Sequence, residues 1–262
     1  MYVITYKRMP DTRTWDGSSY DRISGPMEAL GLAVLSRLDL AGDETVLDAG
    51  CGSGRITQAL IERLPEGHVV AADASASMVA AARERLPGAD VRQIDLLELD
   101  LASLGLSEPL DAILSTATFH WIIDHELLFR RLHGVLRAGG RLVAQCGGRG
   151  NIDVLRGHAN DVLAREPYAA RFAGFRQPWN YAGPEQTQQR LLDAGFTEAE
   201  CWLQAAPKEP DQPREFLSTI VLGPHYQHLP EELRELFIDD VLAELGEPVV
   251  VDYVRLNIDA TA

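Results

Sequence analysis

The stretch that decides the fold is VLDAGCGSGRITQAL, residues 46–60, which places three glycines within five positions and then continues as an amphipathic helix. Ordering glycine costs more backbone entropy than ordering any other residue, so a glycine cluster is an unfavourable way to begin a helix. A glycine-rich turn between a strand and a helix lets a ligand approach the backbone, where a Cβ atom would clash. We therefore predict a ligand site here; the alternative is a tight turn that holds no ligand.

The spacing of these glycines narrows the class of ligand. A dinucleotide fingerprint requires G-x-G-x-x-G, whereas Gly50, Gly52 and Gly54 are spaced G-x-G-x-G and Arg55 stands at the third position. A phosphate-binding loop requires a Gly-Lys pair, and the sequence contains none. The pattern therefore argues against both a dinucleotide and a nucleoside triphosphate.

Strands and helices alternate around the turn as far as residue 147. We predict strands over 44–50, 68–73, 89–95, 110–117 and 141–147, and helices over 26–38, 53–64, 75–86 and 124–137. The last of these helices is expected to end at the Ala-Gly-Gly of 138–140. Alternation without long loops is typical of a parallel sheet with helices on both faces.

The pattern becomes irregular beyond residue 147 and then resumes. We predict a helix over 152–165, a loop rich in aromatic residues, a helix over 184–195, a strand over 196–207, helices around 213–222 and 230–245, and a closing strand over 248–260. We expect one domain over 1–262, with a lid (1–25), a ligand-binding core (40–147), a cap insert (148–184) and strands and helices that complete the sheet (185–262).

Composition and charge bound the class of protein. The chain has 262 residues, 46% of them hydrophobic, and no run reaches the about 18 apolar residues that a membrane span needs. The N-terminus also lacks the apolar core of a signal peptide, so we expect a cytoplasmic protein. The net charge of −15 disfavours nucleic acid and anionic membranes as partners. Cys51, Cys146 and Cys201 are too few and too widely spaced to indicate disulfides or a metal site.

The segment VLDAGCGSGRIT resembles motif I of the class I methyltransferases that use S-adenosylmethionine (SAM), in which an acid precedes a G-x-G-x-G turn. Asp73 and Asp95 end the next two predicted strands, where this family places acids, and VLRAGGRLVAQ resembles a later segment of the family, so the similarity spans residues 40–147. The resemblance implies an α/β fold with a doubly wound, mostly parallel seven-stranded sheet and an antiparallel closing strand. It also implies SAM as the cofactor.

The resemblance assigns roles to several residues of this core. Asp73 would bind the ribose hydroxyls, although it also stands where it could cap the next helix. Asp95 would accept a hydrogen bond from the adenine amine, unless it is a solvated acid, and Leu96 would donate its backbone N–H to the adenine ring. Asp48 would orient the turn through backbone N–H groups or reach the ligand through water. The other candidates for cofactor contacts are Gly50, Cys51, Gly52, Gly54, Ala74, Thr116 and Met78, the last of which has core packing as its alternative.

The segment STATFHWIIDHELLFRRLHGVLRAGG narrows the resemblance to the trans-aconitate methyltransferase-like group, whose members include enzymes that methylate small carboxylic acids. Carboxylate O-methylation of a small molecule is therefore the first expectation. Methylation of a phenol, alcohol or carbon acceptor, or SAM binding without catalysis, remains the alternative. A carboxylate is ionised at pH 7 and needs no base, whereas a phenol or alcohol would use one, for which His120 is the candidate. The alternative for His120 is a structural hydrogen bond.

Polar-tipped aromatic and arginine side chains in loops supply the candidate substrate contacts. WDGSSYDR near the N-terminus resembles the lid of the same group. A planar guanidinium matches a carboxylate, so Arg22, Arg171 and Arg176 are candidates for binding an anionic acceptor. The aromatic candidates for the walls of the pocket are Trp15, Tyr20, Trp121, Trp179 and Tyr181.

Overall fold

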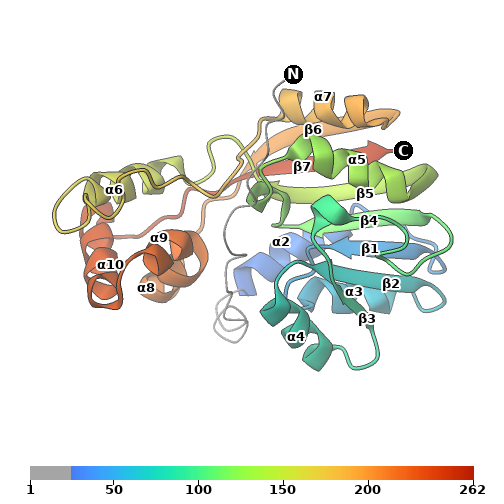
Figure 1. The fold of residues 1–262 in the computed structure, drawn as a ribbon, viewed down its shortest axis with the longest axis horizontal. Helices are drawn as coiled ribbons and strands as arrows, with labels where there is room; N and C mark the ends of the chain where they lie inside the picture. Colours follow the sequence, from blue (N-terminus) through green and yellow to red (C-terminus); the bar gives the residue numbers. More distant parts are fainter. Residues whose placement is uncertain (1–24) are drawn as a thin grey trace, which may run out of the picture.

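A seven-stranded sheet forms the centre of the computed structural model, which describes residues 25–262 of the chain (Figure 1). The strand order is β3-β2-β1-β4-β5-β7-β6. Strands β1 to β5 pair in parallel, and β7 runs antiparallel to both β5 and β6. The predicted sheet and its antiparallel closing strand are thus confirmed. The strands are β1 (Thr45–Ala49), β2 (His68–Asp73), β3 (Asp90–Gln93), β4 (Leu110–Thr116), β5 (Leu136–Gly147), β6 (Glu198–Ala205) and β7 (Val254–Thr261).

Helices cover both faces of this sheet, as the alternation predicts. On one face Phe129, Leu132 and Leu191 belong to a buried cluster that includes the central strands. On the other face Val34 and Leu60 pack in a separate cluster with strand residues. The two apolar layers hold the sheet as a doubly wound structure. The flanking helices are α2 (Gly25–Leu35), α3 (Arg55–Arg63), α4 (Ala76–Arg85), α5 (His125–Val135) and α7 (Pro184–Ala194).

The predicted boundary between α5 and β5 is wrong. The helix ends at Val135, and the strand begins at once with Leu136, which pairs with Leu110 of β4. The register then shifts, so that Arg141 pairs with Ala112. Pairing with β4 therefore takes Leu136 into the sheet, and the glycines that were expected to end the helix lie within an irregular first part of the strand.

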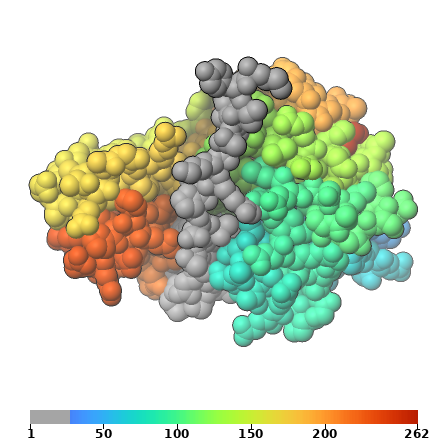
Figure 2. All heavy atoms as spheres, in the orientation of Figure 1, coloured from blue at the N-terminus to red at the C-terminus, as the bar shows by residue number. Residues whose placement is uncertain are grey.

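Four further helices build a cap lobe beside the sheet: α6 (Asp153–Leu163), α8 (Pro213–Phe216), α9 (Gly223–His228) and α10 (Glu231–Leu245), with a π-helical turn over Leu217–Val221. The lobe has an apolar core of its own, to which Leu155, Tyr168 and Phe237 belong. Figure 1 shows these helices beside the layers that cover the sheet, and Figure 2 shows the yellow and orange atoms of the lobe gathered on one side of the molecule. Segments on both sides of α7 and β6 in the sequence thus meet in one cap. No helix within residues 25–262 is long and apolar enough to cross a membrane.

Candidate functional site

The glycine turn lies where β1 ends and α3 begins. Gly50, Gly52 and Gly54 all have positive φ angles, of 82°, 55° and 85°, which side chains disfavour. The backbone N–H of Gly50 donates to the carbonyl of Ala72 at 2.7 Å, which ties the turn to β2. A Cβ atom on Gly50 would lie 2.2 Å from the Thr118 side chain, whereas one on Gly52 would meet nothing within 4 Å. Among the described residues, the side of Gly52 on which a Cβ atom would stand is therefore open.

Asp73 connects the end of β2 with this turn. Its Oδ2 accepts the backbone N–H of Gly52 at 3.0 Å, and its Oδ1 accepts that of Ser75, the N-cap residue of α4, at 2.8 Å. Burial raises the pKa of Asp73, and the two backbone hydrogen bonds oppose that rise. Each carboxylate oxygen has a second lone pair for a ligand. Asp73 thus supports the helix and the turn while keeping acceptor capacity, and its contact with ribose stays a prediction.

Asp48 is almost fully buried behind the turn. Its Oδ2 accepts a hydrogen bond from the Thr57 hydroxyl at 2.6 Å, so the described contact is with α3 and not with N–H groups of the turn. Its Oδ1 is buried and has no hydrogen-bond partner among residues 25–262. Burial raises the pKa of Asp48 to about 6, Thr57 lowers it and the charge of Asp73 adds to the rise. An acceptor atom without a partner at this depth fits a bound water or ligand.

The remaining cofactor candidates follow the ends of β2 and β3. Asp95 is exposed, and its Oδ1 accepts the backbone N–H of Leu97 at 3.0 Å, which caps the 3₁₀ turn η1 (Leu96–Glu98). The Leu96 side chain is buried in the sheet core. Met78 is also buried, on α4, and Ala74 is half-buried and accepts a side-chain hydrogen bond from Gln93. The adenine contacts expected of Asp95 and Leu96 stay predictions.

A pocket opens beside the turn at the carboxyl ends of the parallel strands. It brings together four predicted residues, Gly50, Cys51, Gly52 and Thr116, whereas Asp73 and the adenine candidates do not line it. Ala117 follows β4 in a left-handed conformation with φ of 56° and donates its N–H to a β5 carbonyl. The described residues that line this pocket are Glu28, Leu30, Gly31, Gly50, Cys51, Gly52, Ser53, Arg55, Ile56, Thr116, Ala117, Gln145 and Arg255.

His120 is buried in the short 3₁₀ turn η2 (Phe119–Trp121) that follows β4. Its Nδ1 accepts the backbone N–H of Gly147, the last residue of β5, at 3.3 Å. Because Nδ1 is the acceptor, the neutral ring carries its proton on Nε2. This tautomer makes Nε2 a hydrogen-bond donor and leaves it without a lone pair for a proton. The geometry therefore suits a donor better than a general base.

Three predicted aromatic residues gather around this histidine. Tyr181 stacks on the His120 ring with centroids 5.8 Å apart, and Trp179 stacks on Tyr181 at 5.7 Å. Trp121 lies 5.9 Å from Trp179 and also contacts His120. The backbone N–H of Asn180 donates to the His120 carbonyl at 2.8 Å, which fixes the cap loop to η2. The cap thus contributes its aromatic residues at the edge of the sheet.

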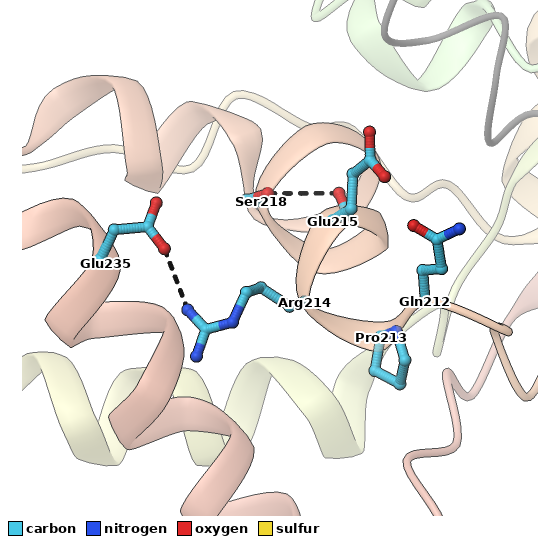
Figure 3. Close-up of a pocket in the computed structure, with 6 residues that line it drawn as sticks. All are labelled: Gln212, Pro213, Arg214, Glu215, Ser218 and Glu235. Atoms are coloured by element: carbon cyan, nitrogen blue, oxygen red, sulfur yellow. Dashed lines mark hydrogen bonds and ion pairs between the residues drawn. The ribbon is translucent and has the colours of Figure 1, made fainter.

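Two of the three arginines selected from the sequence, Arg171 and Arg176, do not belong to this cluster. Arg171 and Arg176 are exposed, and Trp15, Tyr20 and Arg22 lie outside the described residues. Besides the pocket at the glycine turn, the cap lobe has a pocket lined by Gln212, Pro213, Arg214, Glu215, Ser218 and Glu235 (Figure 3). Its Arg214 pairs with Glu235 at 3.0 Å and with Asp239. That pocket therefore offers an anion little net attraction. Within residues 25–262 no group of three His, Cys, Asp or Glu side chains is placed to hold a metal ion.

Sequence reasoning missed Gly147 and Arg255. A Cβ atom on Gly147 would lie 2.7 Å from the Tyr181 ring, so glycine is needed for the aromatic contact. Arg255 is buried near the start of β7 and lines the pocket beside the turn. Because β7 is antiparallel, its first residues lie where the parallel strands end. The predicted antiparallel strand was the signal that could have drawn attention to its beginning.

Residues 46–140 match the family of methyltransferase domains. The chain is 36% identical over 166 residues to a trans-aconitate 2-methyltransferase of Azoarcus, a match that covers 62% of this chain and 61% of the relative. It is 32% identical over 196 residues to a trans-aconitate 2-methyltransferase of Methylobacterium nodulans, covering 73% of this chain and 68% of that one.

Solved structures show the same fold at low identity. A phosphoethanolamine N-methyltransferase 2 of Haemonchus contortus, in complex with S-adenosylhomocysteine, has a TM-score of 0.60 and 19% identity over 94% of this chain and 56% of its own. The YcgJ protein of Bacillus subtilis has a TM-score of 0.60 and 16% identity over 89% of this chain and 97% of its own.

Proposed function

Because the chain belongs to the family of SAM-dependent methyltransferases, we propose that it transfers the methyl group of SAM to a carboxylate oxygen of a small organic acid. The observation that carries this proposal is the similarity to relatives named trans-aconitate 2-methyltransferase, since trans-aconitate is a tricarboxylic acid. The match spans 61% of the first of these relatives, and the acceptor is our proposal for this chain.

The residues at the turn fit SAM, which supplies a sulfonium methyl group to a nucleophile. We assign Asp73 to the ribose hydroxyls, because its two oxygens are held by backbone N–H groups and each keeps a lone pair. The open side of Gly52 admits a ligand against the backbone. The buried Oδ1 of Asp48, which has no hydrogen-bond partner among the described residues, supports a bound water or ligand behind the turn. Asp95 and Leu96 are assigned to adenine.

The surroundings of His120 support a carboxylate acceptor over a phenol or alcohol. An ionised carboxylate needs no general base, and His120 carries its proton on Nε2 while Nδ1 accepts from Gly147. Nε2 would then donate to an acceptor oxygen and orient it. Trp121, Trp179 and Tyr181 would exclude water from that oxygen, which favours in-line displacement by positioning the reactants.

The first experiment is a calorimetric titration with SAM and with S-adenosylhomocysteine, with NADH as the control ligand. We expect both adenosyl ligands to bind at micromolar concentration and NADH not to bind. Purified protein is then incubated with SAM and separate di- and tricarboxylic acids, phenols and alcohols. A base-labile methyl ester from the acids supports the proposal, and methylation only of phenols or alcohols contradicts it. SAM binding without any methylated product across the panel contradicts it in favour of a non-catalytic SAM-binding protein.

We also propose that the protein works in the cytoplasm on a small molecule and not on nucleic acid. The structure has free thiols at Cys51, Cys146 and Cys201, which stay reduced in that compartment. The net charge of −15 opposes association with phosphate backbones.

A further inference from the structure

We propose that Arg255 binds a carboxylate of the methyl acceptor, and that this carboxylate is not the one that is methylated. The inference rests on the proposed function and deepens it, because it limits the acceptor to acids with at least two carboxyl groups. It also assigns to Arg255 the recognition that the sequence suggested for Arg22, Arg171 or Arg176.

Arg255 reaches the pocket because of the direction of its strand. It is the second residue of β7, which begins at the edge of the sheet where β1, β4 and β5 end. Only 4% of its surface is exposed, yet it lines the pocket together with Gly50, Thr116 and Gln145. Its guanidinium carbon lies 4.3 Å from the centre of the Tyr253 ring, a cation–π contact that supports the side chain. A buried cation is thus placed at the wall of the pocket beside the glycine turn.

The register connects Arg255 with the cluster around His120. Arg255 pairs across the sheet with Gly147, whose N–H donates to Nδ1 of His120. Burial raises the pKa of Tyr181, and the positive charge of Arg255 opposes that rise. Arg255 and His120 are thus connected through Gly147, and the inference requires that one acceptor molecule reach both side chains.

The chemistry of a guanidinium favours a carboxylate. Its N–H groups form a planar fork that matches the two oxygens, and the pairing is stronger inside a protein than in water. In a chain of net charge −15, a cation at the pocket also gives an anionic acceptor a local attraction that the surface lacks.

Methyl transfer requires that the attacking oxygen direct a lone pair at the methyl carbon. A bidentate guanidinium pair occupies in-plane lone pairs of both oxygens and lowers their nucleophilicity. The carboxylate held by Arg255 is therefore a spectator, and a second carboxylate receives the methyl group. The new O–C bond forms as the S–C bond breaks, and S-adenosylhomocysteine and the methyl ester, which keeps the charge of the spectator carboxylate, leave without any proton transfer.

SAM also contains a carboxylate that Arg255 could bind. The test therefore measures the binding of SAM and the binding of the acceptor separately. We compare wild type with Arg255→Met, Arg255→Lys and the control Arg130→Met, which removes an exposed arginine on α5. Each protein is titrated with SAM, and its kinetics are measured with a dicarboxylic acid that wild type methylates and with the monoamide of that acid. Thermal melting shows whether Arg255→Met folds as wild type does. If it does not, Arg255→Lys, which keeps the buried positive charge, is used for the comparison.

We expect Arg255→Met to raise KM for the diacid about 10- to 100-fold, as for a lost charged hydrogen-bond pair, while SAM affinity stays within about twofold. The KM of Arg255→Lys should lie between those of wild type and Arg255→Met, because lysine keeps the positive charge but lacks the planar pair of N–H donors. For wild type, KM should rise by a similar factor when the monoamide replaces the diacid. Arg255→Met should have about the same KM for the two compounds. Arg130→Met should behave as wild type.

Unchanged KM in Arg255→Met would overturn the inference, as would a KM that rises equally for diacid and monoamide. Weakened SAM binding with an unchanged acceptor KM would also overturn it, by placing the methionine carboxylate of SAM on Arg255. Failure of the proposed function is distinct and appears earlier, as wild type that binds SAM and esterifies no acid.

Discussion

Asp73 and His120 each make a backbone contact and keep a polar atom for the role that we propose for them. Asp73 holds the N–H groups of Gly52 and Ser75 and keeps lone pairs for a ligand. His120 fixes itself to Gly147 through Nδ1 and presents a protonated Nε2. In both cases the backbone contact fixes the orientation of a side chain to which we assign a ligand contact, so conservative and truncating substitutions should differ in their effect on binding and rate.

Asp73→Ala removes two hydrogen bonds to the backbone and the proposed ribose contact. We expect SAM affinity to fall at least ~10-fold, in line with charged hydrogen bonds worth about 1.5–3 kcal/mol. Calorimetry measures the affinity, and Glu84→Ala on the exposed side of α4 is the control. Unchanged affinity in a folded Asp73→Ala protein would remove Asp73 from the ribose site.

His120→Ala should lower kcat about 100-fold, the range of positioned catalytic groups, and leave SAM affinity nearly intact. His120→Gln keeps an N–H donor but cannot take a proton, so we expect it to recover part of the lost rate with a carboxylic acid. Single-turnover rates at several pH values make the comparison. Absence of rescue by glutamine together with a rate that falls in acid would instead indicate a general base.

Asp48 makes stability depend on pH. Burial raises its pKa from the ordinary 3.8 to about 6, so the folded state holds a proton more tightly than the unfolded state. Its destabilising effect is therefore absent below about pH 4, grows between pH 4 and 6 and is complete above, of order 3 kcal/mol. Asp48→Asn should be more stable than wild type at pH 7 and equally stable at pH 4 in urea unfolding. A stability difference that does not change with pH would contradict this.

At the scale of elements, local patterns were enough for most of the sheet. The apolar run of β2 has the predicted bounds, and the glycine spacing located the turn, because both signals lie in adjacent residues. The start of β5 was missed because Leu136 is drawn into the sheet by Leu110, far away in sequence. Arg255 was missed for the same reason: only the antiparallel register places it beside Gly147. Tertiary pairing, which periodicity does not encode, decided these positions.

Gly147 tests the junction of β5 with the cap loop. A Cβ atom there would lie 2.7 Å from the Tyr181 ring and 2.9 Å from Nδ2 of Asn151, so Gly147→Ala should displace the aromatic stack. We expect a strong fall in kcat/KM for the acceptor and little change in SAM affinity. Gly157→Ala, in α6 with open space around it, is the matched control and should raise stability by up to about 1 kcal/mol. Wild-type kinetics in Gly147→Ala would show that the stack can relax.

The sheet, with apolar clusters on its two faces, and the cap lobe, with a cluster of its own, have separate cores. The sheet carries the glycine turn, Asp73 and Arg255, whereas the cap lobe packs around Phe237 and supplies Trp179 and Tyr181. The contacts between His120, Asn180 and Tyr181 connect the cap to the sheet edge. A destabilising substitution in one core should therefore change the binding of the acceptor and the binding of the cofactor to different extents.

Phe237→Ala and Phe129→Ala form a matched pair for this division, since both rings are fully buried, one in each core. Each substitution should lower the free energy of unfolding of the surrounding core by about 3–5 kcal/mol, because apolar burial is lost and a cavity is left behind. Phe237→Ala should speed amide exchange in α6 and α10 and raise the acceptor KM while SAM still binds, because the residues that we propose to hold the cofactor lie on the sheet. Phe129→Ala should speed exchange in α5 and the central strands and weaken SAM binding. If both variants instead loosened the same set of amides, the two cores would unfold as one unit, and the cap could not adjust to an acceptor independently of the cofactor site.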